Sequence, residues 1–299
     1  MPERANPFGR VLTAMVTPFD AQLELDPGRV RQLADHLLAN GTESLVATGT
    51  TGEAPTLEHE EKLSLWRILR AHLDQNGSRA KLITGTGSYS TKAAVRLSLD
   101  AQECGADALL VVNPYYNKPN QEGLLRHFEA IAEAVTIPIV LYNHPGRTGV
   151  SLETATVCKL AAHPRIVAIK DSSCNFAFLS EVRAKAPQDF LIFSGDDPLT
   201  LPILAVGGDG VISVASHVAG KQISRMVEAF FSGDIATAQQ DHLRLLPLAQ
   251  GLFCAPSPSP VKYALERIGI SVGGVRLPLT DLDASKQQLV NELLQALHL

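Results

Sequence analysis

The stretch IVAIKDSS, residues 166–173, begins with four apolar residues and then places a lysine, Lys170, where the apolar run ends. A short run that is apolar on both faces is typical of a strand in a parallel sheet, because crossover helices cover both faces of such a sheet. In α/β proteins of this kind, ligands bind at the carboxyl ends of the strands. Lys170 therefore stands where chemistry is expected, provided that the rest of the chain builds such a sheet.

The chain repeats the same unit, an apolar run followed by a turn and a helical pattern. Alternating strands and helices predict a parallel sheet. Eight units favour a closed (β/α)8 TIM barrel over an open doubly wound sheet, whose GxGxxG marker is missing after the first run. The eight predicted strands are residues 11–16, 44–49, 81–87, 108–113, 138–143, 166–170, 190–195 and 210–215.

The chain beyond the eighth run is helical in pattern, with helices expected at 235–253, 260–269 and 284–299. We therefore predict two units, a catalytic barrel at 1–231 and a helical C-terminal extension at 232–299 packed on it. Earlier helices are expected at 27–40, 58–74, 91–105, 122–135 and 152–163.

The composition describes a water-soluble chain, with 45% hydrophobic and 19% charged residues and a formal charge of −5. No basic stripe suits nucleic acid, and no window approaches the roughly 18 apolar residues of a membrane span. The N-terminus lacks a signal-peptide hydrophobic region, so we expect a cytoplasmic protein. Cysteine and histidine spacings predict neither a disulfide framework nor a metal site.

Lys170 is the only one of the ten lysines that ends a predicted strand. Partial burial lowers the pKa of an amine because it disfavours the charged form, and an uncharged amine is a nucleophile. The alternative, which is commoner for a strand-end lysine, is an ion pair with a carboxylate such as Asp171 or Asp196.

Two neighbouring segments supply groups that suit a 2-oxo acid. In LYNHPGRTG, residues 141–149, the Tyr142 phenol is placed to relay protons and the Arg147 guanidinium to bind a carboxylate. In GTTGEAPTL, residues 49–57, two hydroxyls and a Gly-flanked turn offer further carboxylate donors. Each feature also has a plain structural alternative: a satisfied core tyrosine, a solvated arginine, and an ST-turn that caps the next helix.

These motifs, with VVNPYYNKPNQEGL, SGDD, GGDGVISVAS and PSPVK, resemble the pyruvate-dependent class I aldolase and lyase family over residues 9–280. The resemblance is greatest to members that condense pyruvate with L-aspartate 4-semialdehyde to 4-hydroxy-tetrahydrodipicolinate, on the route to lysine and diaminopimelate. It implies a covalent pyruvate Schiff base on Lys170, no separate cofactor and no metal. It also implies a homotetramer built as a dimer of dimers.

The resemblance also implies roles for single residues. Tyr142 matches the relay tyrosine and Thr50 the hydroxyl that extends the relay, while Tyr116 matches a tyrosine inserted from the neighbouring subunit. Thr51 matches the residue that binds the carboxylate of pyruvate, and Arg147 matches the arginine that binds the carboxylate of the aldehyde substrate. Gly195 and Ile212 match positions whose backbone lines the pocket.

Several positions depart from the commonest family pattern. His144, Gly146 and His217 stand where Val, Ser and Asn are common. The His144 ring is expected to face solvent; the alternative is that it lies near the pocket and affects the fine specificity. The site at which some relatives bind L-lysine is matched at His59 and Tyr115, but Ala93 replaces a carboxylate, so we expect weak or absent feedback inhibition.

Other functions stay open at this stage. N-acetylneuraminate lyase, 2-keto-3-deoxygluconate aldolase and 4-hydroxy-2-oxoglutarate aldolase share the Schiff-base residues, but the pair Thr50 and Thr51 with Arg147 favours the synthase reaction. A non-catalytic barrel that binds an oxo acid is the alternative from another class.

Overall fold

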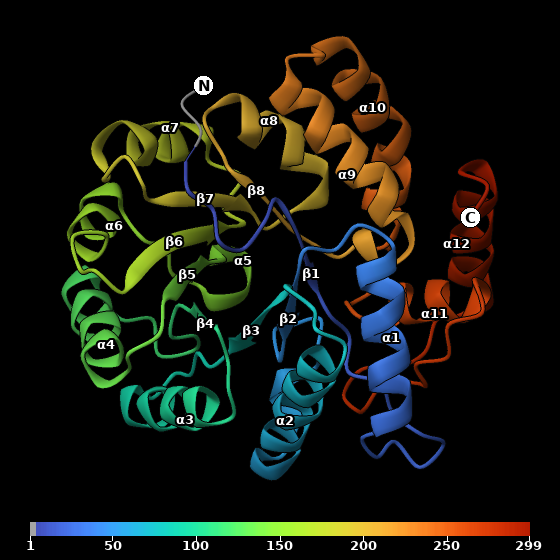
Figure 1. Cartoon of the computed structure of the whole chain (residues 1–299), viewed down its shortest axis with the longest axis horizontal. Helices are drawn as coiled ribbons and strands as arrows, with labels where there is room; N and C mark the ends of the chain where they lie inside the picture. The colour runs from blue at the N-terminus through green and yellow to red at the C-terminus, as the bar shows by residue number, and fades with distance from the viewer. Residues whose placement is uncertain (1–3) are drawn as a thin grey trace.

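The computed structural model describes residues 4–299, and in it eight parallel strands close into one barrel surrounded by helices (Figure 1). β1 pairs with both β2 and β8, which closes the ring. The predicted fold is therefore confirmed. The strands are β1 (Val11–Ala14), β2 (Ser44–Ala47), β3 (Lys81–Gly85), β4 (Ala108–Val112), β5 (Ile139–Asn143), β6 (Ile166–Asp171), β7 (Leu191–Ser194) and β8 (Gly210–Ser213).

All eight predicted strands are present, with ends that differ by one or two residues. The main difference is at the carboxyl ends, where residues such as Gly49 and Gly195 belong to loops and not to the ladder. β6 instead runs one residue longer than predicted, to Asp171, because that residue still pairs with Asn143 and Ser194 of the neighbouring strands.

The helices expected from the sequence are also confirmed, within about three residues at each end. They are α1 (Pro27–Ala39), α2 (His59–Gln75), α3 (Thr91–Glu103), α4 (Gln121–Ala134), α6 (Thr154–Leu160), α10 (Ile235–Gly251), α11 (Ser259–Arg267) and α12 (Ala284–Ala296). The structure adds four helices that were not predicted: the short α5 (Pro145–Thr148), and α7 (Phe176–Lys185), α8 (Thr200–Ala205) and α9 (Ser216–Ser232). It also contains two single 3₁₀ turns, η1 (Ala54–Thr56) and η2 (Asp197–Leu199).

The hydrophobic core has two layers, because alternate residues of each strand point to opposite sides of the sheet. The outer layer lies between the strands and the helices around them. The inner layer fills the barrel itself and is a single cluster that includes Leu12, Val46, Ile83, Leu110, Val140, Tyr142, Ala168, Phe193 and Ile212. Because Ala168 belongs to the inner layer, the side chain of Lys170, two positions later, also faces the barrel interior.

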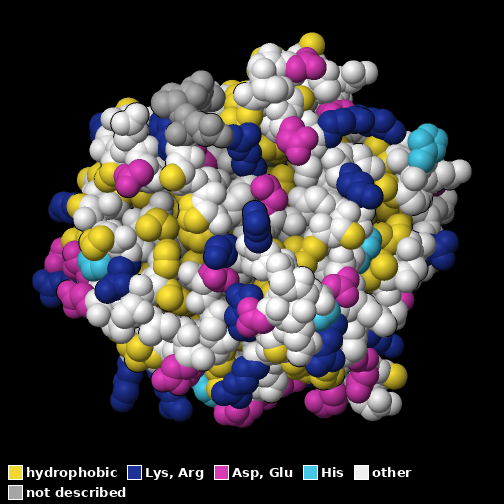
Figure 2. All heavy atoms as spheres, viewed as in Figure 1, with side chains coloured by type: hydrophobic (Ala, Val, Ile, Leu, Met, Phe, Trp, Pro, Cys, Tyr) yellow, Lys and Arg dark blue, Asp and Glu magenta, His cyan; other side chains and the backbone are white. Residues whose placement is uncertain are grey.

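The surface carries charges of both signs. Figure 2 shows Lys and Arg side chains interspersed with Asp and Glu side chains over the face in view. Within residues 4–299, no helix is long and apolar enough to cross a membrane.

The helices α10 to α12 follow the barrel and pack against one side of it (Figure 1). One tie between this extension and the barrel is a buried ion pair: Lys262 Nζ of α11 lies 2.7 Å from Glu53 Oε1, and both side chains are at most 3% exposed. Lys262 also donates to the Gly274 carbonyl at 2.7 Å. Glu53 belongs to the loop after β2, so the extension holds that loop in place. The division at residue 231 into two units stays a prediction.

The buried pair predicts a large loss of stability when one partner is removed. Lys262→Met leaves the Glu53 carboxylate buried without its counter-charge, which should lower the free energy of unfolding by about 3–5 kcal/mol. The matched control is Lys185→Met, which breaks an exposed pair with Glu181 (3.2 Å, side chains 62% and 54% exposed) and should cost no more than about 1 kcal/mol. Urea unfolding followed by circular dichroism measures both, and equal losses would contradict the assignment.

Candidate active site

Lys170 is buried at the carboxyl end of β6, with 5% of its surface exposed. Its Nζ lies 4.3 Å from the centroid of the Tyr142 ring, the residue opposite it on β5. Among residues 4–299, no carboxylate oxygen lies within 4 Å of this nitrogen. Asp171 instead accepts hydrogen bonds from Asn143 and Ser173. The alternative of an ion pair with Asp171 or Asp196 is therefore wrong.

Burial lowers the pKa of Lys170 from 10.5 to about 8. The negative charges of Asp196 and Asp197 act in the opposite direction, and Arg147 adds a smaller lowering effect. Desolvation is the largest cause, and with this pKa about a tenth of the amine is uncharged at pH 7, far more than for an ordinary lysine. This is the condition that a nucleophilic lysine requires.

The Tyr142 side chain lies beside the amine in the inner layer. Burial raises the pKa of the Tyr142 phenol to about 12, while Arg147 and the hydroxyls of Ser172 and Thr50 act to lower it. Tyr142 is therefore neutral at neutral pH and carries a proton that it can donate. The structure thus brings together three residues expected to relay protons or react: Lys170, Tyr142 and Thr50.

Gly195 lies against the lysine, as predicted for a pocket-lining position. A Cβ at Gly195 would stand 2.0 Å from Ser172 Oγ and 3.1 Å from Lys170 Cε. Only glycine leaves space here for both side chains. The Gly195 N–H donates to the Asp171 carbonyl at 2.7 Å, which fixes β7 against β6.

The loop after β2 presents Thr50 and Thr51 at the same end of the barrel. Its turns are closed by Gly52 N–H to Gly49 O (3.1 Å) and Glu53 N–H to Thr50 O (3.0 Å), and Thr17 Oγ1 donates to the Gly52 carbonyl at 2.6 Å. Within residues 4–299, neither threonine hydroxyl caps η1 or α2, so the ST-turn alternative is wrong. Thr51 is buried, and its role in binding a carboxylate stays a prediction.

A groove of about 860 Å³ opens beside these residues. Its lining includes Thr50, Tyr142 and the exposed Arg147. The lining also includes His59, Ala93 and Tyr115, at the positions compared above with a lysine-binding site, and their neighbours Lys62 and Tyr89. The expected weak response to L-lysine stays a prediction.

Five of the eight predicted site residues lie outside the lining of this groove: Lys170, Thr51 and Gly195, described above, and Ile212 and Tyr116. Ile212 is fully buried in the inner layer of the barrel. Tyr116 points away from its own barrel: it is 92% exposed, in the loop after β4, with a φ of 73°. A bulky residue with positive φ is uncommon, and the loop thereby holds a large aromatic ring in solvent. Tyr116 therefore does not complete the site of its own chain.

The structure corrects the expectation that the His144 ring faces solvent. The ring packs edge-on against Tyr142, with centroids 5.8 Å apart, and its Nδ1 atom is buried. Burial lowers the pKa of His144 to about 4. The imidazole is therefore neutral and forms part of the wall around Tyr142.

His217 has a structural role in the barrel. It is fully buried, its Nε2 accepts the Val16 N–H at 3.1 Å, and its Nδ1 lies 2.8 Å from the Val214 carbonyl. Burial lowers its pKa to about 4. A neutral ring thus ties the start of α9 to the end of β1.

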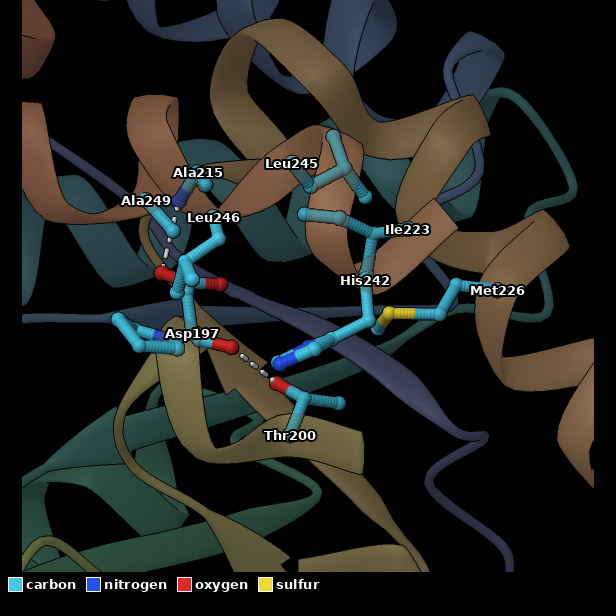
Figure 3. A pocket seen from close by; sticks show the side chains of 10 residues that line it. Asp197, Thr200, Ala215, Ile223, Met226, His242, Leu245, Leu246 and Ala249 are labelled. Carbon is cyan, nitrogen blue, oxygen red and sulfur yellow. Dashed lines mark hydrogen bonds between the residues drawn. The ribbon is translucent and has the colours of Figure 1, made fainter. Parts of the chain in front are cut away.

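Sequence reasoning missed how Asp197 and Ser172 are used. The buried Asp197 carboxylate accepts hydrogen bonds from Ser213 Oγ and from the N–H groups of Val214 and Ala215. Behind it is a cavity of about 10 Å³, into which His242 of α10 points (Figure 3). This volume holds at most one water molecule, so the cavity is no binding site for a keto acid. Ser172 follows Lys170 by two residues, so alternation along the strand could have placed its side chain on the same face as that of the lysine.

The described residues contain no group of three or more His, Cys, Asp or Glu side chains that could hold a metal ion. The Tyr142, Thr50 and Ser172 hydroxyls and the Arg147 guanidinium near Lys170 suit proton transfer and the binding of carboxylates, and the Asp196 and Asp197 carboxylates act on Lys170 from further away.

Comparison with known proteins identifies the family. Residues 7–297 match the model of the dihydrodipicolinate synthetase family. The 4-hydroxy-tetrahydrodipicolinate synthase of Listeria welshimeri is 51% identical over 292 residues, which cover 97% of this chain and 99% of the relative. The enzyme of the same name from Desulforamulus reducens is 47% identical over 293 residues, covering 98% of each chain.

Solved structures agree with this match. A dihydrodipicolinate synthase of Bacillus anthracis superposes with a TM-score of 0.94 at 45% identity, over 96% of this chain and 98% of that one. The enzyme of Cyanidioschyzon merolae with lysine bound gives 0.95 at 43% identity, over 97% and 98%. With the barrel, the buried lysine and relatives that match almost from end to end, this chain belongs to the dihydrodipicolinate synthetase family.

Proposed function

We propose that this protein condenses pyruvate with L-aspartate 4-semialdehyde to 4-hydroxy-tetrahydrodipicolinate, in the biosynthesis of lysine and diaminopimelate. The observation that carries the proposal is the buried, unpaired amine of Lys170 beside the Tyr142 phenol. The names of the relatives support the same reaction. No observation favours the sugar-acid aldolases or a non-catalytic barrel.

In this mechanism the neutral Lys170 amine attacks the ketone carbon of pyruvate. Loss of water then gives an iminium, which draws electrons from the neighbouring methyl group and allows it to lose a proton. The resulting enamine carbon attacks the aldehyde carbon of the second substrate. Cyclisation finally releases the product from the lysine, so the only covalent carrier is Lys170 and no separate cofactor takes part.

Tyr142 supplies and recovers the protons in these steps, and Thr50 links it to the groove. A phenol suits this role because it moves protons without placing a carboxylate next to the iminium. Thr51 and the turn around it bind the carboxylate of pyruvate. Arg147, exposed at the mouth of the groove, binds the carboxylate of the aldehyde substrate.

The exposed Tyr116 ring supports an assembly of several subunits. We infer that this exposed ring enters the site of a neighbouring subunit and lengthens its proton relay, in a homotetramer that is a dimer of dimers. One related structure is described as a monomeric variant of the enzyme, so family membership alone does not fix the assembly of this chain. We place the enzyme in the cytoplasm, with no nucleic-acid or membrane partner.

The reaction is tested by offering different aldehydes together with pyruvate. With L-aspartate 4-semialdehyde, we expect turnover in an assay coupled to reduction of the product. N-acetylmannosamine and glyceraldehyde should give turnover lower by at least about a thousandfold, because they carry no carboxylate for Arg147. Preferential turnover of either one would assign the chain to a different aldolase activity.

The lowered pKa of Lys170 predicts the pH dependence of Schiff-base formation. Because only the neutral amine attacks, the rate of borohydride trapping with pyruvate should rise about tenfold between pH 7 and pH 9 and then level off. Asp196→Asn removes a charge that raises this pKa, so its curve should shift to lower pH. A rate still rising steeply above pH 9, as for a lysine with a pKa of 10.5, contradicts the assignment.

Mixed oligomers test the sharing of Tyr116. Lys170→Ala should be inactive, and Tyr116→Ala should lose about 90% or more of its turnover. When the two variants are expressed together, some sites combine an intact Lys170 with the intact Tyr116 of the other variant, so turnover should recover. The control is coexpression of Lys170→Ala with a Lys170→Ala, Tyr116→Ala double variant, which should recover none. If the first mixture also stays inactive, Tyr116 does not act across an interface.

A further inference from the structure

Ser172 directly follows β6, two positions after Lys170. Its N–H donates to the Asn143 carbonyl at 2.9 Å, which continues the β5–β6 ladder past Asp171. Side chains two residues apart on a strand point to the same face. Ser172 therefore faces the same side as the Lys170 amine, toward the mouth of the barrel.

The contacts of Gly195 show how near the two side chains are. A Cβ at Gly195 would lie 2.0 Å from Ser172 Oγ and 3.1 Å from Lys170 Cε, so these two atoms are at most 5.1 Å apart, the sum of the two distances. The same hydroxyl is close enough to Tyr142 to act on the pKa of its phenol. Ser172 thus lies beside both the nucleophile and the proton donor.

The Ser172 hydroxyl is buried, and the polar group it acts on in the free protein is the Tyr142 phenol. The residue is 7% exposed, and its Oγ has no hydrogen-bond partner of regular geometry among residues 4–299. A buried hydroxyl without a partner costs about 1–3 kcal/mol, and such groups are few in a folded protein, so each calls for an explanation. Since this one lies next to the reacting amine, a bound substrate is the partner that accounts for it.

We propose that Ser172 is a catalytic residue whose hydroxyl donates a hydrogen bond to the former ketone oxygen of pyruvate in the covalent adduct on Lys170. This inference rests on the proposed function, because it names a group for one step of that reaction. It differs from the role of Tyr142, which gives up a proton, since Ser172 transfers none.

The step is the conversion of the ketone to the iminium. The Lys170 amine forms a C–N bond to the ketone carbon, the carbonyl π electrons move to oxygen, and a proton passes from nitrogen to oxygen to give a carbinolamine. The C–O bond then breaks, and the oxygen takes a proton from Tyr142 and leaves as water. The Ser172 hydrogen bond stabilises the negative oxygen of the first stage and directs it toward Tyr142 in the second.

The test is Ser172→Ala, measured by the rate at which borohydride fixes pyruvate on the protein in a single turnover. Loss of one donor to the adduct oxygen should slow trapping by about tenfold to a thousandfold. The melting temperature without pyruvate should not fall, because the substitution removes a hydroxyl that makes no hydrogen bond of regular geometry within residues 4–299 of the free protein.

Ser173→Ala is the matched control. This neighbouring hydroxyl donates to Asp171 at 2.7 Å and stands outside the proposed reaction, so trapping should stay within about twofold of the original protein. Trapping by Ser172→Ala at the original rate overturns the inference. A lowered melting temperature or misfolding of Ser172→Ala also overturns it, since the hydroxyl would then support the fold. Absence of any adduct in the unsubstituted protein refutes the proposed function itself.

Discussion

Desolvation of one amine is the constraint on which the whole site depends. The protein buries two lysines almost completely, and it treats them differently. Lys262 is paired with Glu53 at 2.7 Å, so its charge is compensated and it serves as a structural tie. Lys170 has no such partner among the described residues, and burial lowers its pKa to about 8. Burial lowers the pKa of Lys262 as well, but there the adjacent Glu53 carboxylate acts to raise it. The same residue type therefore serves as a structural tie in one place and as a nucleophile in the other.

The barrel makes this arrangement possible because its strands bring distant segments into register. Tyr142 on β5 and Phe193 on β7 lie opposite Lys170, and the alternation that buries Ala168 also turns Lys170 inward. The loops at the carboxyl ends then add Thr50, Arg147 and Gly195. The extension contributes indirectly: through Lys262 and Glu53 it supports the loop that presents both threonines, and α10 packs behind Asp197.

Much of this could be predicted from the sequence, where local pattern decides the structure. The eight strands follow from short apolar runs, and the inward position of Lys170 follows from alternation along β6. The rest depends on contacts between residues far apart in the chain. The pairing of Lys262 with Glu53, for example, follows from how the extension packs. The match of Tyr116 to an intersubunit residue came from family resemblance, and its outward direction came only from the structure.

Peptide mapping after reduction shows whether Lys170 is the buried amine that reacts. The protein is treated with pyruvate and sodium borohydride, digested, and searched for one reduced pyruvate unit by mass spectrometry. We expect a single modified peptide carrying the unit on Lys170, with Lys262 unmodified because its ammonium stays paired with Glu53. An unchanged mass, or a label on Lys262 or another lysine in place of Lys170, would contradict this assignment.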